Sequence, residues 1–593
     1  MIRLPLSLAG VILFVAVSSS ALAQKADPNA PPAGSPAAQV AAIRVQPDKA
    51  PDCSSLKAIV QSVTAEAKTN DQKAIAIYNF MLLTHFHCPY AVEDGGIPAL
   101  KEINVYGYGV CGGTHAVQSA LWRELGWQWR FIGWPGHTTV EAQYDGKWHY
   151  FDAFLKFYAW MPDGKGGSTV AGEYDLLADK KQLIDDAFVF DDKRSCTYMK
   201  YDQFVMVDGK PNWRAHEFLS CGDSMASGIP KQLNKAGPSE DWAGYKHATG
   251  LYSTNVNLSP GFCMTNTWDS VPDAWYWKGS KVPPAHSCPN NKDTRNNPGY
   301  GLVLEPYIDS RPARTYANGT LVFAPDLAGQ AALKSFLKTE NVKVAGKALV
   351  PAEAGKPAIV VVQLAGPYVL TLGKGEAQGA ETVEVSVDDG RTFQKADLAN
   401  FSQAIKGKLS AQVKIGFSTA LKGLRIEATF ENNVGALPFL SPGRNKVAVA
   451  VADAKALGEN KLVVTYAYRL GSRGLNFEQL CTQGKRIANQ SGAKWDSDVT
   501  YAQKTFTAKD LPATFEIDCP TPKGQTPVYP RMVFVRREVL APGAAPQPLP
   551  AGAVEAKPAA AEELQELPNP LTIGFQPPPP TAASAPAKAA KAE

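Results

Sequence analysis

The sequence predicts a multidomain α+β protein, with helices and a β-hairpin in its first third and β-sandwich modules of the immunoglobulin-like type in its second half. The length of 593 residues corresponds to about three or four domains. Apolar residues recur at helical spacing between residues 114 and 125. Beyond about residue 302, short runs rich in Val, Ile and Thr alternate with Gly, Asn and Asp, as in sandwich strands.

The N-terminus has the pattern of a secretory signal peptide over residues 1–23. Arg3 supplies the positive start, residues 8–17 form an apolar core, and Ala21-Leu22-Ala23 is a small-x-small cleavage site. We therefore expect cleavage after Ala23 and a secreted or periplasmic mature protein. We expect no membrane span, because no other stretch is long and apolar enough. Residues 24–51 are rich in Ala and Pro and predict a disordered linker.

Cys111 lies at the predicted start of a helix. The apolar residues of the segment 114–125 share one face, and Gly126 occupies the position of a C-terminal cap. Glycines on both sides of Cys111 allow a sharp turn that exposes its side chain. The positive end of a helix dipole favours a thiolate, which is the nucleophilic form of cysteine.

The segment after this helix reads as a hairpin. His137–Tyr144 alternates, Asp145-Gly146 forms a two-residue turn, and Lys147–Phe154 returns. With Tyr144 opposite Lys147, Asp152 falls opposite Thr139 and shares a face with His137. The two residues are then diagonal neighbours with Cα atoms about 7–8 Å apart, within reach of an imidazole and a carboxylate. A slip of one residue would separate them.

These placements predict a catalytic triad of Cys111 as nucleophile, His137 as base and Asp152 as the group that orients the base. Taken singly, a buried or paired cysteine, a structural histidine and a solvated aspartate are the simpler interpretations. Their joint spacing favours the triad over an inactive relative. His115 follows Cys111 by one helical turn and is expected to pack beside the site. The candidates for a second oxyanion donor, besides the Cys111 amide, are Asn104, Tyr106 and Tyr108.

The residues from about 53 to 157 resemble the transglutaminase-like superfamily, whose fold is a variant of the papain-like fold. The likeness is carried by the three triad residues, Leu121–Gly126, Arg130–Gly133 and Asp145–Trp148. One departure is Ala153, where the family often has proline, and another is the short gap between Cys111 and His137. The resemblance implies a catalytic domain over residues 52–234 that transfers acyl groups at an amide through a cysteine thioester.

That reaction implies a protein or peptide substrate, cross-linked or deamidated at glutamine, and needs no cofactor or metal. The alternatives are a cysteine peptidase or amidase of the same fold and an inactive surface or adhesion protein. The sequence has no phosphate-binding loop, dinucleotide fingerprint or strong metal motif. Its formal net charge is +4 without clustered Lys or Arg, which argues against a nucleic-acid partner. Trp134 and Trp148 are candidates to flank the cleft, with packing in the core as the equal alternative.

The nine cysteines leave one thiol unpaired in an exported chain, which is consistent with a catalytic Cys111. The other eight fall into four pairs of neighbours in the sequence, and a disulfide within each pair is our hypothesis. The pairs are 53 with 88, 196 with 221, 263 with 288, and 481 with 519.

The rest of the chain is divided by composition. Residues 235–339 are Trp-rich with many Gly, Pro and Asn, and predict an irregular, disulfide-stapled connection. Residues 340–440 and 441–540 predict two sandwich modules, which bind a cell-wall polymer or only present the catalytic domain. Residues 541–593 are rich in Ala and Pro and predict a disordered tail.

Overall fold

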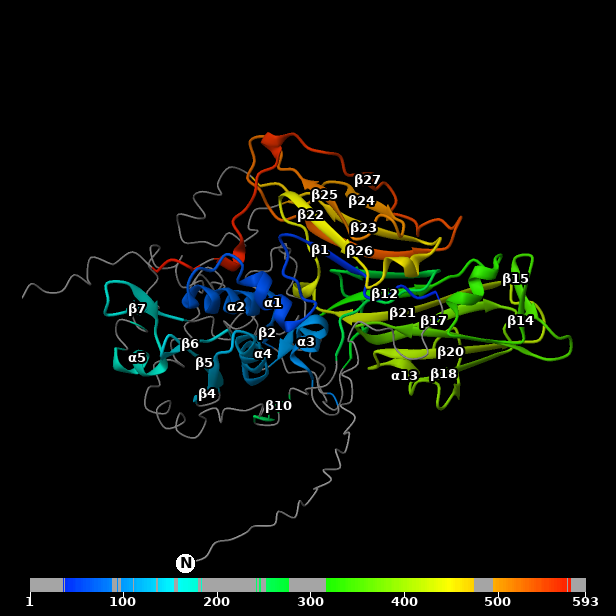
Figure 1. Cartoon of the computed structure of the whole chain (residues 1–593), viewed down its shortest axis with the longest axis horizontal. Coiled ribbons are helices and arrows are strands. Elements are labelled where there is room, and N and C mark those ends of the chain that lie inside the picture. The colour runs from blue at the N-terminus through cyan, green and yellow to red at the C-terminus, as the bar shows by residue number, and fades with distance from the viewer. Residues whose placement is uncertain are drawn as a thin grey trace, which may run out of the picture.

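The computed structural model has a helical part, formed by the N-terminal third of the chain, beside a larger β-rich part (Figure 1). The chain is thus a mixed α and β protein, as the sequence predicts. None of the helices in the described part of the chain has the length and hydropathy to cross a bilayer. The residues that the structure describes are 36, 38–87, 93, 97–109, 111–134, 137–153, 158–179, 183, 241–242, 245–246, 252–276, 316–473, 494–572 and 574–577.

The helical part has short helices whose ends follow local chemistry. The side chain of Ser55 accepts a hydrogen bond from the Ala58 amide and starts the first helix, and Thr69 does the same for the second. Gly126 has a φ of 75°, so it ends the fourth helix as predicted. The helices are α1 (Leu56–Val63), α2 (Asn70–Thr84), α3 (Ala99–Lys101), the π-helix η1 (Glu102–Tyr106), α4 (Cys111–Glu124) and α5 (Glu173–Ala178).

The predicted hairpin is present with its predicted register. Tyr144 pairs with Lys147 and Val140 with Phe151. Asp145 and Gly146 have φ of 49° and 78°, the positive values of a type I′ turn. The sheet order is β4 (Gln128–Trp134), β5 (His137–Tyr144) and β6 (Lys147–Phe151), and the smaller strands nearby are β2 (Phe86–His87), β3 (Tyr108–Gly109), β7 (Trp160–Pro162) and β8 (Ser168–Val170).

The β-rich part is built around one sheet of eight strands. Its order is β17-β21-β12-β11-β26-β23-β24-β27. The strands are β11 (Phe262–Thr267), β12 (Ala317–Phe323), β17 (Val369–Gln378), β21 (Gly423–Asn432), β23 (Lys461–Arg469), β24 (Val499–Phe506), β26 (Arg531–Leu540) and β27 (Val554–Glu555).

Smaller sheets complete this part. Five strands pair in the order β13-β16-β20-β18-β19, and three in the order β1-β22-β25. The remaining elements are β1 (Arg44–Pro47), β9 (Asp241–Trp242), β10 (Tyr245–Lys246), η3 (Gln330–Ser335), β13 (Lys338–Glu340), β14 (Val342–Ala345), β15 (Ala348–Pro351), β16 (Ala358–Ala365), β18 (Thr382–Ser386), β19 (Gln394–Lys395), α13 (Ser402–Ile405), β20 (Ser410–Phe417), η4 (Val434–Ala436), β22 (Gly443–Ala450), η5 (Ala454–Leu457), β25 (Ala513–Cys519), η6 (Ala561–Glu563) and η7 (Pro570–Thr572).

The eight-stranded sheet corrects the predicted division of the β region. Strands β11 and β12 come from the segment 235–339, which the sequence predicts to be irregular, yet they lie in the middle of the sheet. They join β21, from the first predicted module, to β26, from the second. The boundary at residue 440 therefore does not separate two independent sheets. Gly319 in β12 allows close packing across this sheet, because a Cβ on Gly319 would lie 2.3 Å from the Phe430 ring.

Both chain ends also differ from the prediction of disorder. Strand β1, from the predicted linker 24–51, pairs with β22. From the predicted tail, strand β27 pairs with β24 in the eight-stranded sheet, and η7 packs against α2, where the red end of the chain reaches the helical part in Figure 1. There the Asn79 side-chain amide donates to the carbonyl of Leu571 at 2.8 Å. These segments are ordered by contacts with distant residues, which composition alone does not reveal.

This C-terminal segment explains why α2 is buried on every side. Helix α2 packs against η7 on one face and against α1, α4 and η4 on others. Asn433, just before η4, donates from Nδ2 to the carbonyls of Thr84 at 2.9 Å and Ile103 at 2.6 Å. The β-rich part is therefore docked on the helical part through buried hydrogen bonds.

The structure does not contain the predicted disulfides that involve described cysteines. Cys53, Cys263 and Cys519 carry thiols and are buried in packed surroundings, with exposed fractions of 7%, 5% and 2%. The Asn445 side-chain amide contacts the sulfur of Cys519 at 3.7 Å. Their predicted partners, and the pair 196 with 221, lie outside the described residues.

Candidate functional site

Cys111 is the first residue of α4, as the sequence predicts, and its side chain is half-buried. The turn that leads to it depends on Gly107, which has a φ of 64°. A Cβ on Gly107 would lie 2.4 Å from the side chain of Asn433, so only glycine fits this contact. The β-rich part thus touches the chain four residues before the candidate nucleophile.

His115 fastens α4 to the hairpin. Its side chain is fully buried, and Nδ1 lies 2.7 Å from the carbonyl oxygen of Thr138, while Nε2 lies 3.2 Å from the amide nitrogen of Ala153. A carbonyl only accepts and a backbone amide only donates, so Nδ1 donates to Thr138 and Nε2 accepts from Ala153. The Nε2 lone pair is therefore engaged by the Ala153 amide. His115 packs beside the site, as expected, and does not serve as its base in this arrangement.

The two residues that His115 contacts are the chain neighbours of the other candidate triad members. Thr138 follows His137, and Ala153 follows Asp152. Because His115 lies one helical turn after Cys111, a rise of about 6 Å, these contacts bring the start of α4 to the start of β5 and the end of β6. The backbones of the three candidates therefore converge on one locality.

Asp152 is held in a defined orientation. It directly follows β6 and is fully buried, and the Tyr150 hydroxyl donates to its Oδ2 at 3.0 Å. Its Oδ1 lies 3.5 Å from Nε2 of His115. The hydroxyl of Thr139 donates to the carbonyl of Phe151 at 3.1 Å, which ties the two strands together beside the carboxylate.

His137 is the first residue of β5, and its backbone pairs with that of Trp134. This agrees with the predicted start of the strand. The side chains of His137 and Trp134 lie outside the described residues. The side chain of Trp148, the second predicted cleft residue, packs under the Arg130 guanidinium, whose Cζ lies 4.4 Å from the ring centroid.

The three side chains predicted as second oxyanion donors are engaged elsewhere. Asn104 donates from Nδ2 to the carbonyls of Cys53 at 3.1 Å and Leu100 at 2.9 Å. The Tyr106 hydroxyl donates to Glu93, and that of Tyr108 donates to Glu431 at 3.3 Å. Each hydroxyl has one hydrogen, so neither tyrosine can donate it to an oxyanion while it bonds its glutamate. Sequence spacing could not show these carboxylate partners, because Glu431 is distant in the chain.

Two buried carboxyl groups, those of Glu102 and Glu431, contact the residues just before Cys111, and the sequence predicted neither contact. Glu102 in η1 lies against Gly109, where an added Cβ would be 3.1 Å from its Oε1. Burial raises the pKa of Glu102 to about 8. Burial also raises the pKa of Glu431 to about 8, although it accepts hydrogen bonds from Tyr108 and from the Tyr276 amide. Both groups are therefore largely neutral at pH 7.

The far end of the hairpin is fixed by a separate polar contact. Asp71, in the first turn of α2, accepts hydrogen bonds from the Tyr144 hydroxyl at 2.7 Å and from the Val170 amide at 3.2 Å. The hairpin is therefore held by α4 at one end and by α2 at the other. A strand fixed at both ends positions side chains more accurately than a loop does.

Comparison with known proteins yields no matching family model, no similar curated protein and no similar solved structure. Within the described ranges, no group of three or more His, Cys, Asp or Glu side chains is arranged to hold a metal ion.

Proposed function

We propose that this protein is an exported cysteine acyltransferase of the transglutaminase-like type, with Cys111 as nucleophile, His137 as base and Asp152 as the orienting carboxylate. The observation that carries the proposal is a pair of hydrogen bonds: His115 Nδ1 donates to the Thr138 carbonyl, and the Ala153 amide donates to His115 Nε2. Through them the helix that begins at Cys111 meets the residues adjacent to His137 and Asp152. The predicted hairpin register, which puts His137 and Asp152 on one face, supports the same grouping.

The chemistry follows from these positions. His137 takes the proton of the Cys111 thiol, and the thiolate attacks the carbonyl carbon of a glutamine side-chain amide. The C–N bond then breaks, His137 protonates the departing ammonia, and a thioester remains on Cys111. A primary amine or water attacks the thioester and restores the thiol. Asp152 holds the imidazole in the productive tautomer, and Tyr150 holds Asp152.

The oxyanion of the tetrahedral intermediate would be stabilised by backbone amides at the start of α4. The first N–H groups of a helix have no carbonyl partner within it and lie at the positive end of the dipole. Each oxyanion donor contributes about 2.7–4 kcal/mol to transition-state stabilisation. This assignment replaces the side chains of Asn104, Tyr106 and Tyr108.

The test uses the protein without residues 1–23, and it compares the parent with Cys111→Ala, His137→Ala and Asp152→Ala. One assay follows incorporation of a labelled primary amine into a glutamine-containing protein, a second follows ammonia release, and a third follows peptide cleavage. The proposal expects amine incorporation that each substitution abolishes. Cleavage without amine uptake would assign the cysteine peptidase or amidase alternative, and no activity in any assay would favour the inactive relative.

Cys263→Ala is a matched control for the loss of a thiol. Burial raises the pKa of the Cys263 thiol to about 12, with a further increase from Glu538, so it should be a poor nucleophile. Its replacement should leave amine incorporation unchanged. If amine incorporation fell equally in Cys263→Ala and in Cys111→Ala, the assignment of Cys111 as nucleophile would be refuted.

A further inference from the structure

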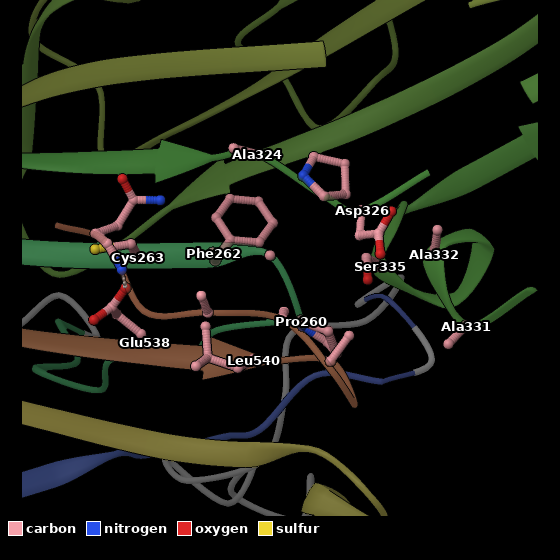
Figure 2. Close-up of a pocket in the computed structure, with 16 residues that line it drawn as sticks. Pro260, Phe262, Cys263, Ala324, Asp326, Ala331, Ala332, Ser335, Glu538 and Leu540 are labelled. Carbon is pink, nitrogen blue, oxygen red and sulfur yellow. Dashed lines mark hydrogen bonds between the residues drawn. The ribbon is translucent and has the colours of Figure 1, made fainter. Parts of the chain in front are cut away.

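A small pocket opens at the ends of β11, β12 and β26, away from the candidate triad (Figure 2). Its volume is about 50 Å³. In Figure 2, Cys263 and Glu538 lie on one side of Phe262, while Asp326 and Ser335 lie on the other. The walls between these polar groups are apolar and include Leu540 among other residues. The pocket therefore has polar groups on both sides of Phe262 and apolar side chains between them.

Two buried polar side chains that line this pocket have atoms without a hydrogen-bond partner. Glu538 is 1% exposed, and its Oε1 accepts from the Gln547 amide at 2.7 Å, but its Oε2 has no partner. Ser335 is also 1% exposed, and its Oγ has none. A buried polar group left in this state costs about 1–3 kcal/mol, and more when it is charged. Both groups would therefore gain from a ligand with hydrogen-bond donors.

The charge of the lining selects the sign of the ligand. The lining residues include two carboxylates, Asp326 and Glu538, and no Lys, Arg or His. The two basic residues before Glu538 in sequence bond elsewhere. Arg537 donates from Nη1 to Oδ1 of Asn266 at 2.9 Å, and Arg536 donates from Nη1 to the carbonyls of Gln547 at 3.0 Å and Pro548 at 3.2 Å. An anion would be repelled here, whereas a cation would offset the burial of a carboxylate.

We propose that this pocket binds a small primary alkylammonium ion. The ammonium group would donate to Oε2 of Glu538, and the alkyl chain would lie against Phe262 and Leu540. A water molecule needs about 10–15 Å³ of such space, so 50 Å³ accommodates a ligand of only a few heavy atoms. An ammonium group with a short aliphatic chain matches the acceptor, the walls and the size. The site is independent of Cys111 and does not rest on the proposed acyl transfer.

The test uses the full mature protein and ethylammonium chloride as probe, with binding followed by saturation-transfer NMR and by calorimetry. Ethanol, sodium acetate and sodium chloride are the comparison solutes, because they lack the ammonium, reverse the charge or supply only salt. Glu538→Gln keeps the shape of the side chain and removes its charge. Glu555→Gln is the control, since Glu555 is an exposed carboxylate on β27.

We expect ethylammonium to bind the parent and Glu555→Gln equally and to lose affinity at least tenfold in Glu538→Gln. Ala332→Leu, which places a larger side chain in the pocket wall, should abolish binding as a second, uncharged test. Thermal unfolding without ligand checks that each variant is folded. The proposal is overturned if the parent does not bind ethylammonium, if ethanol or acetate binds as well, or if Glu538→Gln binds unchanged.

Discussion

Replacing His115 with alanine should disconnect the candidate nucleophile from the hairpin. The substitution removes the hydrogen bonds to the Thr138 carbonyl at 2.7 Å and from the Ala153 amide at 3.2 Å, and it leaves both groups buried. Each unsatisfied buried group costs about 1–3 kcal/mol, and the lost ring leaves a cavity, so we expect destabilisation of about 3–5 kcal/mol. Unfolding in urea measures this free energy.

The same substitution should lower catalysis more than its effect on stability explains. A displacement of about 1 Å at a reacting group costs about 100-fold in rate, so kcat for amine incorporation should fall by about that factor with KM little changed. His149→Ala is the matched control, because His149 is equally buried and bonds the Val170 carbonyl at 2.6 Å, but at the turn end of the sheet. Equal kcat losses in the two variants would refute the positioning role of His115.

Three further outcomes follow from the docking of the two parts of the molecule. Asn433→Ala should destabilise the protein by about 2–4 kcal/mol in urea unfolding, because it strands two buried carbonyls of the helical part. The raised pKa values of Glu102 and Glu431, about 8 in the folded protein, mean that these two groups lower stability progressively as the pH rises from about 4.5 to about 8. Each group contributes about 1.4 kcal/mol per pH unit to that fall, so Glu102→Gln should flatten the dependence of Tm on pH. A chain that ends at residue 540 should unfold at a lower temperature than the full mature protein, whereas one that ends at residue 577 should match it, because it keeps the contact with α2.

The site was predictable where local chemistry decides the structure. Asp145-Gly146 permits a type I′ turn, and that turn fixes the register of the whole hairpin. Gly126 ends α4, so the helix could be placed and Cys111 assigned to its first turn. These signals lie within a few residues of the elements that they determine.

The sheet and the chain ends were not predictable, because their partners are distant in sequence. The buried Asn318 in β12 looks like half of an Asn-Gly turn, yet its side chain donates to the Ala274 carbonyl at 2.6 Å and stays inside the sheet. Residues 541–577 have the composition of a disordered tail. Their prolines have no backbone N–H, so they suit an extended segment that makes few backbone hydrogen bonds. The carboxylate partners of Tyr106 and Tyr108, which are Glu93 and Glu431, were not predictable for the same reason. Contacts between residues that are distant in sequence leave no local pattern.

The rate at which iodoacetamide alkylates Cys111, measured by mass spectrometry across pH in the parent and in His137→Ala, tests the central claim most directly. If His137 activates the thiol, the parent should react fast well below pH 8.5, the usual pKa of a free cysteine, and His137→Ala should need a pH near 8.5. The buried thiols of Cys53, Cys263 and Cys519 should react slowly in both proteins. Identical pH profiles for Cys111 in the two proteins would contradict the proposed catalytic unit.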